Sequence, residues 1–320
     1  MKPALRRARR SAFFVPLAGV FLLVLPAWAG LLRVTSGLDD GPGSLREAIL
    51  EANEAPGSTI EVELGDSGLI VLGRSLPPLT GADTTLNGGG VTLREGEGCE
   101  RPGRKKGCDG LVVAGPRVTV RDIDVAGFTF DGVAVRGADA SDVHIEDVSA
   151  IDNLDDGIGV SEGARGVRIE RCLLMGNGHR TKGKGLLVFS EAEATLSASL
   201  VIGNRDGVTV TRGSSADLED VFVVGNFDKG VGLSAGTVVG RRLSISANGL
   251  GDTGHGRAPN GDGLRVGLAG EARLEDSRIA ANGDTGVVVL DTSRVHLDRV
   301  LIEGNRRPTA VEPTATLTRR

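Results

Sequence analysis

Aromatic side chains are scarce in this chain of 320 residues. It contains no Tyr and a single Trp, Trp28, and aromatic residues make up only 3% of the whole. A binding surface built on several stacked Tyr or Trp rings is therefore excluded. Glycine is abundant instead, with 49 residues. Much Gly and few large rings favour a core of small aliphatic side chains.

Long apolar runs are also scarce, and the sequence has one, at residues 12–26. Five basic residues precede this run, and Ala-Trp-Ala follows it at 27–29. A positive start, a short apolar stretch and a small-x-small exit are typical of a secretory signal peptide. We predict a signal peptide at residues 1–29 and a protein that is secreted, periplasmic or on the cell surface. A retained anchor is the alternative, but the run is near the minimum length for a membrane span and contains two prolines.

Basic residues are fewer than acidic ones. The chain has 37 Lys and Arg against 42 Asp and Glu, and five of the basic residues lie in the predicted signal peptide. Cleavage leaves 32 against 42, a net charge of −10. This balance predicts no nucleic-acid partner, because polyanions are bound by basic surfaces. With no second apolar run, the sequence also predicts no membrane span after cleavage.

A block of twelve residues recurs from residue 117 onward. Positions two, four, seven and nine of each block are mostly aliphatic, as Val221 and Val223 illustrate, and a polar pair such as Glu219-Asp220 separates the two halves. Alternation with a period of two predicts two strands joined by a bend. The blocks begin at Arg117, Asp142, Gly166, Glu193, Ser215, Thr237, Glu271 and Arg294.

A third short apolar stretch follows each of the first seven blocks and starts with Gly. These stretches begin at Gly132, Gly157, Gly185, Gly207, Gly230, Gly263 and Gly286. Three strands in roughly 22 residues cannot bury an apolar face alone, so successive repeats must stack. The sequence therefore predicts an all-β parallel β-helix with three short strands per rung, in which like positions lie about 4.8 Å apart.

Asparagine occupies the last position of seven blocks, at Asn153, Asn177, Asn204, Asn226, Asn248, Asn282 and Asn305. Asn tolerates the left-handed conformation that a sharp turn needs, and stacked Asn side chains can hydrogen-bond to one another. We predict a structural Asn ladder along one corner of the solenoid.

The repeat resembles that of the right-handed parallel β-helix proteins, the pectin-lyase-like superfamily. Residues 34–36, 41–49 and 52–53 are similar to the N-terminal cap of many bacterial secreted β-helix proteins. Locally, Ser44 and Glu47 have the spacing of a capping box at the start of a short helix. That helix would cover the open end of the solenoid, whose strand edges are otherwise unpaired. The resemblance specifies the fold and says little about activity.

The resemblance and the repeats together predict the domain organisation. Residues 30–95 form the N-terminal cap and first rungs, 96–305 the β-helix repeats, and 306–320 a C-terminal tail. The tail has no evident cap sequence. It either folds over the last rung, or that end of the solenoid contacts a partner.

Three Cys residues are present. Cys99 and Cys108 flank a short Gly- and Lys/Arg-rich loop, and in an exported protein they predict a disulfide. Cys172 occupies an inward position of its block, which predicts a buried and unreactive thiol.

Candidate functional residues lie between the Asn ladder and the Gly-started strands, where the connections at 178–184 and 249–262 are longest. These two loops would form the walls of a groove over the strands, a location at which pectate lyases and related enzymes of the superfamily bind polysaccharide chains. Functional residues lie disproportionately on loops. The catalytic candidates are Asp206, Asp228, Lys229, His179, His255 and Arg265.

Carboxylates in the same region are candidates for a metal site. Asp155, Asp156 and Asp206 could hold Ca²⁺, the one cofactor that the sequence suggests, because clustered carboxylates are its preferred ligands. A purely structural interpretation competes with this, since Asp-Gly and Lys-Gly are also good turn sequences.

Three functions remain open from the sequence. The first is a non-catalytic exported β-helix protein that binds or scaffolds a polysaccharide or another component of the cell envelope. It is favoured because the strong catalytic motifs of the superfamily's enzymes are absent. The second is a polysaccharide lyase or glycoside hydrolase that uses the groove. The third is an accessory protein that binds a divalent metal.

Overall fold

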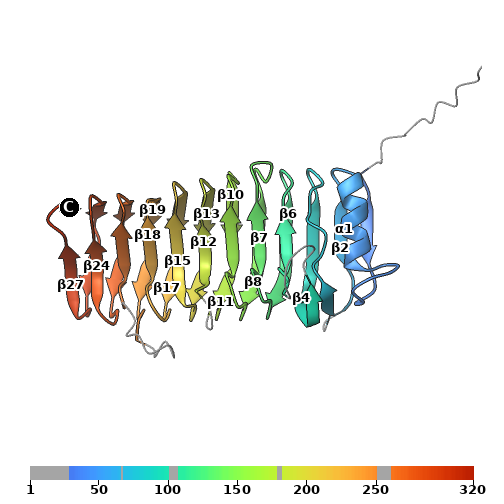
Figure 1. Ribbon diagram of the computed structural model, residues 1–320, viewed down its shortest axis with the longest axis horizontal. Helices are drawn as coiled ribbons and strands as arrows, with labels where there is room; N and C mark the ends of the chain where they lie inside the picture. Colours follow the sequence, from blue (N-terminus) through green and yellow to red (C-terminus); the bar gives the residue numbers. More distant parts are fainter. Residues whose placement is uncertain (1–28, 66–67, 101–106, 179–181, 251–260) are drawn as a thin grey trace, which may run out of the picture.

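The chain folds into an elongated parallel β-helix (Figure 1). The computed structural model describes residues 29–65, 68–100, 107–178, 182–250 and 261–320. Residues 1–28 of the predicted signal peptide lie outside this range. No helix in the described part of the chain is long and apolar enough to cross a membrane. The fold class predicted from the repeats is confirmed, down to the three short strands of each rung.

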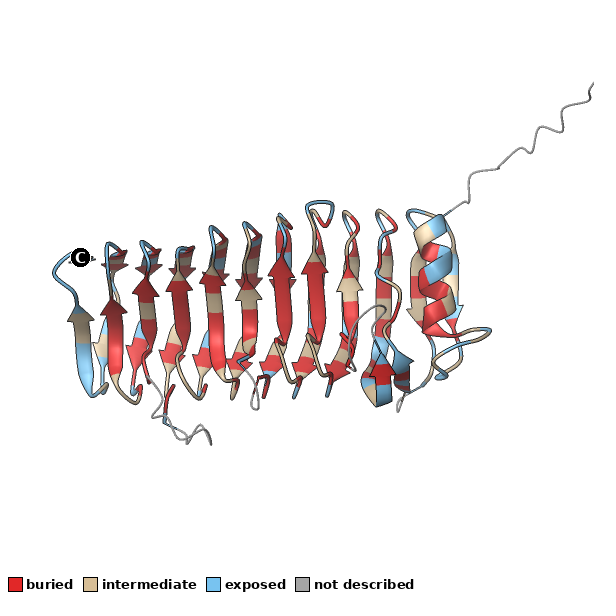
Figure 2. Cartoon of the chain, in the orientation of Figure 1, coloured by how far each residue is buried: buried red, intermediate tan, exposed pale blue. Residues whose placement is uncertain are grey.

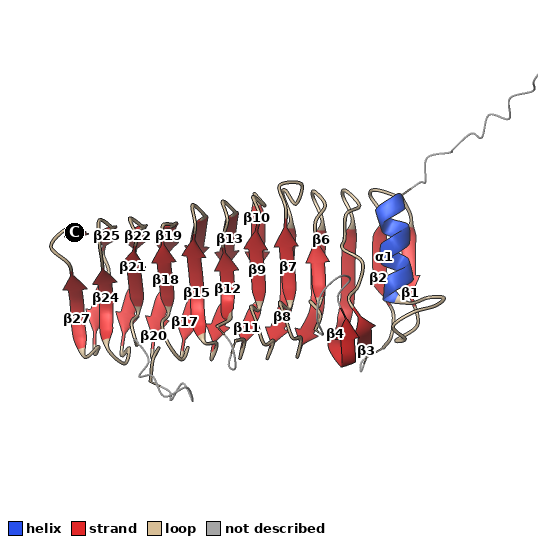
Figure 3. Cartoon of the chain, viewed as in Figure 1, coloured by secondary structure: helices blue, strands red, loops and turns tan. Residues whose placement is uncertain are grey.

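The strands form three faces that run the length of the molecule (Figure 3). The first strands are β1 (Leu31–Val34), β2 (Thr59–Val62), β4 (Thr85–Glu100), β6 (Thr119–Ala126), β8 (His144–Ile151), β10 (Val167–Glu170), β13 (Glu193–Ser197), β16 (Ser215–Glu219), β19 (Thr237–Arg241), β22 (Glu271–Glu275), β25 (Arg294–Asp298) and β28 (Thr316–Arg319).

The second strands follow the bend of each block, and in β4, β6 and β8 they continue the first without a break. The others are β3 (Leu69–Arg74), β11 (Leu173–Met175), β14 (Leu200–Ile202), β17 (Phe222–Val224), β20 (Ser244–Ser246), β23 (Arg278–Ala280) and β26 (Leu301–Glu303).

The third strands form a separate nine-stranded parallel sheet. They are β5 (Leu111–Val113), β7 (Val133–Arg136), β9 (Ile158–Ser161), β12 (Lys184–Val188), β15 (Asp206–Thr211), β18 (Val231–Ser234), β21 (Leu264–Gly267), β24 (Thr285–Val289) and β27 (Arg307–Val311).

The core is a set of aliphatic ladders inside the solenoid (Figure 2). Ile145, Ile169 and Leu196 stand above one another in β8, β10 and β13 and are completely buried. Alternate residues of the same strands face outward, as the period of two predicts. Burying such side chains contributes roughly 1.5–3 kcal/mol each. The small size of the side chains allows the three faces to approach one another closely.

The predicted Asn ladder and the Gly column form one structural unit. The Asn226 side chain oxygen accepts from the backbone N–H and the side chain amide of Asn204, at 2.9 and 3.1 Å. The Asn226 amide nitrogen lies so close to Gly207 that a Cβ there would be 2.9 Å from it. The same contact recurs in other rungs, for example between Asn177 and Gly157. The amide therefore requires the Gly opposite it.

One part of the reasoning behind the ladder is wrong. The left-handed residue of this turn is the one before each Asn, such as Asp152, Ala247 or Gly203, with φ between 53° and 63°. None of the ladder asparagines, all within the described ranges, has a positive φ. Asn is used because its side chain hydrogen-bonds along the stack, and the sharp turn is made by its neighbour.

The N-terminal end is closed by helix α1 (Leu45–Glu54), as predicted (Figure 1). The Ser44 hydroxyl accepts from the Glu47 N–H, as in a capping box, whereas the Glu47 carboxylate accepts from the N–H of Gly43, one residue before the N-cap. Leu45, Ile49 and Ala52 are the buried apolar face of the helix.

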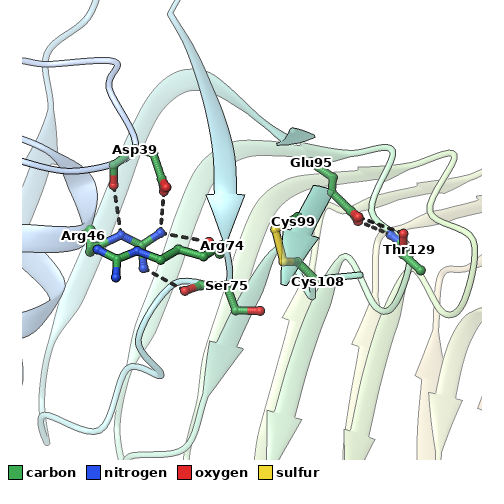
Figure 4. The surroundings of a disulfide bond; sticks show 8 residues. All are labelled: Asp39, Arg46, Arg74, Ser75, Glu95, Cys99, Cys108 and Thr129. Atoms are coloured by element: carbon green, nitrogen blue, oxygen red, sulfur yellow. Dashed lines mark hydrogen bonds and ion pairs between the residues drawn. A yellow bond between two sulfur atoms is a disulfide. The ribbon is translucent and has the colours of Figure 1, made fainter. Parts of the chain in front are cut away.

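Arg46 and a disulfide fasten the first rungs (Figure 4). The buried Arg46 guanidinium donates to the carbonyls of Arg74 and Ser75, at 2.8 and 2.7 Å. Cys99, at the end of β4, is disulfide-bonded to Cys108, which precedes β5. Closing a loop of this length stabilises by about 2–3 kcal/mol.

The C-terminal residues 306–320 continue the solenoid. Strand β27 pairs with β24, and β28 pairs with β25, both in parallel register. Residues 306–320 therefore form a further rung of the solenoid, and a partner contact at this end stays a prediction. Leu317 and Ala315 pack against the core and account for this continuation.

Candidate functional site

Charged side chains line up at the start of the third strands. The residue before each Gly stands above its counterpart in the next rung. The column consists of Asp109, Asp131, Asp156, Lys184, Asp206, Lys229, Asp262 and Thr285, and Arg307, which precedes Pro308, continues it as the register partner of Thr285. The seven repeated Gly residues of the sequence, from Gly132 to Gly286, mark the column from Asp131 to Thr285. Its first member, Asp109, was missed, although the sequence Asp109-Gly110-Leu111 repeats the same pattern.

The N-terminal part of the column forms an acidic cluster, which we define as Asp109, Asp131, Asp155 and Asp156. Carboxylate oxygens of Asp131, Asp155 and Asp156 all lie within 4.8 Å of one another. They line a hollow of about 600 Å³ on the outer face of the nine-stranded sheet. Gly159 keeps this hollow open, because a Cβ there would lie 2.9 Å from the Asp131 carboxylate.

Burial governs the ionisation of the acidic cluster. It raises the pKa of Asp131 to about 7, and the nearby Asp109 carboxylate adds to the shift while Arg136 opposes it. The pKa of Asp156 is also raised, by burial and by Asp131, against the attraction of Lys184. The cluster therefore retains protons near neutral pH, and pairs of carboxyl groups with displaced pKa values are suited to acid–base chemistry.

Two basic residues neutralise part of the acidic cluster. The Arg136 guanidinium, from β7, lies 2.9 Å from the Asp109 carboxylate and 3.4 Å from that of Asp131. The Lys184 ammonium group lies 3.9 Å from Asp156, and the Lys184 backbone N–H donates to the same oxygen at 2.8 Å. Arg136 was not among the sequence candidates, because its position in β7 carries no motif of its own.

A second charged centre surrounds Lys229. Its ammonium group lies 3.1 Å from the Asp206 carboxylate and 3.2 Å from that of Asp228. Burial acts to lower the pKa of Lys229, but these two carboxylates raise it above its ordinary value. Lys229 is therefore protonated at neutral pH, and the structure gives no support to the use of this side chain as a general base.

Asp206 is the buried partner of Lys229. Burial raises the pKa of Asp206, against the attraction of Lys229. Its second oxygen is buried without a hydrogen-bond partner among the described residues. Gly232 leaves the space that the Lys229 side chain occupies, because a Cβ at Gly232 would lie 2.8 Å from the lysine Cε.

Arg265 also lies on this face and forms an ion pair with Asp262 at 2.8 Å. Arg265, Lys229 and Thr209 line a hollow of about 260 Å³. Thr209 is the register partner of Leu187, which lines the hollow at the acidic cluster. The two hollows are thus adjacent, and together they form what we call the groove.

The structure separates the carboxylates that were grouped as metal ligands. Asp155 and Asp156 lie with Asp131, whereas Asp206 lies beyond Lys184 in the column and pairs with Lys229. The set suited to a cation is therefore Asp131, Asp155 and Asp156. His179 and His255, and most of the two long loops, lie outside the described residues.

The Cys172 thiol faces the interior on the other side of the solenoid. Burial raises its pKa to about 12, so the thiol is neutral under ordinary conditions.

Comparisons with known proteins agree with the geometry. A family model described as "right handed beta helix region" matches residues 87–228. The chain is similar to a variant of the periplasmic alginate epimerase AlgG, with 12% identity and a TM-score of 0.59 over 83% of this chain and 72% of that one. It is also similar to the A-module of the Azotobacter vinelandii mannuronan C-5 epimerase AlgE6, with 16% identity and a TM-score of 0.56 over 89% and 98%.

A third similar structure is pectate lyase Pel9A, with 15% identity and a TM-score of 0.55 over 90% of this chain and 78% of that one. No curated protein matches the sequence. The chain therefore has a right-handed parallel β-helix fold, as its repeats and cap predicted.

Proposed function

We propose that this is an exported, carbohydrate-related β-helix protein that binds a polysaccharide chain in the groove of the nine-stranded sheet. The observation that carries the proposal is the pair of adjacent hollows, lined by charged and polar side chains along one open face. The solved structures of similar fold include enzymes whose names specify alginate, mannuronan and pectate. The signal-like N-terminus and the disulfide support export.

The charged side chains of the groove favour a ligand that binds through hydrogen bonds over a ligand that binds through its net charge. Lys184, Lys229 and Arg265 are each paired with an Asp of the same face. A sugar chain can exchange hydrogen bonds with such pairs without leaving a buried charge unpaired. A uronate chain would need either protonated Asp131 and Asp156 or a cation between the carboxylates.

A second candidate function is glycoside hydrolysis at the acidic cluster. It is favoured by one observation, the pKa of about 7 for Asp131 beside other carboxyl groups. A protonated carboxyl group can donate to a leaving glycosidic oxygen while a neighbouring carboxylate acts as base or nucleophile. In this function Asp131 is the acid, and Asp155 or Asp156 is its partner.

The test measures binding and turnover together. Purified protein is incubated with a panel of neutral and acidic polysaccharides, with Ca²⁺ or with chelator. Affinity, new reducing ends and unsaturated uronates are followed. We expect at least one polysaccharide to bind, and Asp131→Asn and Asp156→Asn to weaken that binding. Asp217→Asn, an exposed position on the first strand β16, is the matched control and should leave binding unchanged.

The outcomes separate the candidates. Binding without turnover supports the non-catalytic role. New reducing ends that fall by about 10²-fold or more in Asp131→Asn support hydrolysis. Calcium-dependent binding assigns a cation to the cluster. Absence of binding to the whole panel by folded protein contradicts the proposal.

A further inference from the structure

An apolar patch lies on the second-strand face of the central rungs, away from the groove. Phe222 is 57% exposed and Met175 is 37% exposed. Contiguous exposed apolar side chains are typical of a surface that contacts a partner. In register order the patch consists of Ile151, Leu173, Met175, Leu200, Ile202, Phe222 and Val224.

A hollow of about 530 Å³ lies within the patch. It forms at the rung of Ala198 and Ser199, where small side chains stand between the larger ones of the neighbouring rungs. Leu173 lines it from one side and Phe222 from the other. The surface is therefore shaped to accept a protruding side chain.

Charges border the patch in a regular order. The residue at each bend has a positive φ, and we call these residues the bend column. Asp147, Arg171, Ala198, Asp220 and Arg242 follow one another along it, one per rung. Arg171 forms an ion pair with Asp147 at 2.9 Å, and Arg242 with Asp220 at 2.7 Å.

The charges of the bend column are antisymmetric about Ala198. One rung away stand Arg171 on one side and Asp220 on the other, and two rungs away stand Asp147 and Arg242. Consider a second copy that faces this surface with its solenoid axis reversed and its Ala198 opposite the Ala198 of the first copy. Each rung of one copy then meets the rung of the other copy that lies equally far from Ala198 on the opposite side. Each of the four charged positions within two rungs of Ala198 then meets the opposite charge.

Ala198 is the rung at which such an arrangement places its symmetry axis. A residue on a two-fold axis contacts its own copy, so a charge there would be repelled. Within the bend column from Asp122 to Arg299, all of it in described segments, Ala198 is the one uncharged member. A parallel arrangement would instead place every charge against its like.

We propose that this face binds a second copy of the chain, forming an antiparallel dimer whose two-fold axis runs along the rung of Ala198 and Leu200. Phe222 of each copy packs against Leu173 and the hollow of the other. Arg171 meets Asp220 of the second copy on both sides of the axis. The contact spans five rungs, about 19 Å, and ends where Asp122 would meet Asp276 of the second copy, a like charge.

The dimer leaves the groove accessible, because the groove lies on the nine-stranded sheet. The proposal does not depend on the polysaccharide function. If that function holds, the dimer presents two grooves of opposite direction, and one long chain or two neighbouring chains can be held with increased avidity.

Sedimentation velocity over a wide range of protein concentration tests the dimer. We expect the purified protein to form a dimer at high concentration, and Phe222→Asp and Leu200→Asp to be monomers with unchanged circular dichroism. Val71→Asp is the matched control. Val71 is 44% exposed and stands in the register column of Met175, four rungs away. It should leave the dimer intact. A wild-type monomer at all concentrations, or an oligomer that Phe222→Asp does not change, overturns the proposal.

Disulfide trapping locates the axis. Ala198→Cys places a thiol on the axis, opposite the same thiol of the second copy, and a disulfide can form where the two Cα atoms approach to about 4.4–6.8 Å. Mild oxidation should convert this variant to a covalent dimer. Glu193→Cys, exposed on the first-strand face of the same rung, should remain monomeric in denaturing electrophoresis. Equal cross-linking of both variants, or of neither, contradicts the arrangement.

Charge reversal tests the register. Arg171→Glu alone and Asp220→Arg alone should each weaken the dimer, because each places like charges in contact. The double variant restores opposite charges across the interface and should dimerise more strongly than either single variant. If it is weaker than both, the antiparallel register is wrong.

Discussion

At the scale of single residues, Asp131 keeps its proton at pH values at which a carboxyl group in water would be ionised. Its side chain is 15% exposed, and it shares the acidic cluster with three other carboxyl groups. The resulting pKa of about 7 lies well above the 3.8 of a free Asp. Ionised Asp131 therefore destabilises the native state, and the protonated form does not.

This shift predicts a particular pH dependence of stability. A raised native pKa means that the native state binds the proton more tightly than the unfolded chain, so stability falls as the pH rises from about 4 to about 7. Asp131→Asn removes the titration and keeps an acceptor oxygen. We expect the variant to be more stable than wild type at pH 8 by about 2–4 kcal/mol, and to differ little at pH 4.

Urea denaturation at the two pH values measures this difference. Asp217→Asn is the control, because Asp217 is exposed and its replacement should change stability by less than about 0.5 kcal/mol at either pH. A stability difference for Asp131→Asn that is the same at both pH values would show that burial does not raise the Asp131 pKa.

Sequence reasoning reached part of the site at this scale. Asp156, Asp206 and Lys229 were among the sequence candidates, and each of them precedes a repeated Gly. Arg136 was not, because nothing in its local sequence distinguishes it, and only the stacking of β7 beside Asp109 makes it a partner. The pairing of Lys229 with Asp206 was likewise invisible, since it depends on the register between rungs.

At the scale of structural elements, each corner of the solenoid follows a different rule. The bend column uses residues with positive φ, several of them Arg and Asp that pair between rungs. The next corner uses Asn side chains that hydrogen-bond from rung to rung, with Gly opposite them. The ladder is buried, so its hydrogen bonds are not exchanged with water.

Asn226→Leu tests the ladder at its centre. Leu cannot accept from the N–H and side chain amide of Asn204, nor donate to the carbonyl of Val201. Leaving buried polar groups without partners costs about 1–3 kcal/mol in the free energy of unfolding. Asn87→Leu is the matched control, because Asn87 is only partly buried and donates to a single side chain, Glu61. Equal losses for the two variants would mean that the ladder has no special role.

At the scale of the whole molecule, stability is a sum of contacts between neighbouring rungs. Each strand pairs with its counterparts one rung before and one rung after. A rung is therefore replaceable, provided that the next one keeps its register. The cap helix and the rung that holds the disulfide are the exceptions, because the helix closes the N-terminal end and the disulfide joins Cys99 of β4 to Cys108 before β5.

Deletion of residues 204–225 tests this modularity. The deletion joins Gly203 to Asn226, so one 22-residue coil is removed and the ladder remains continuous. We expect a cooperative thermal transition and β-sheet circular dichroism, with a modestly lower Tm because one rung interface is lost. Deletion of residues 204–214 removes half a coil, reverses inward and outward positions, and should prevent folding. Comparable behaviour of the two deletions would rule out the nearest-neighbour description.

The sequence by itself determined the solenoid, its rung length, the cap and the positions of the ladders. It could do so because each of these features repeats, and repetition multiplies a weak local preference into a strong pattern. The tertiary structure alone decided which charged side chains meet. Register between rungs, burial and the direction of each outward side chain place Asp131 beside Asp155, Lys229 between Asp206 and Asp228, and Ala198 midway between opposite charges. Except for the sequence neighbours Asp228 and Lys229, those relations join residues more than twenty positions apart, where local chemistry leaves no mark in the sequence.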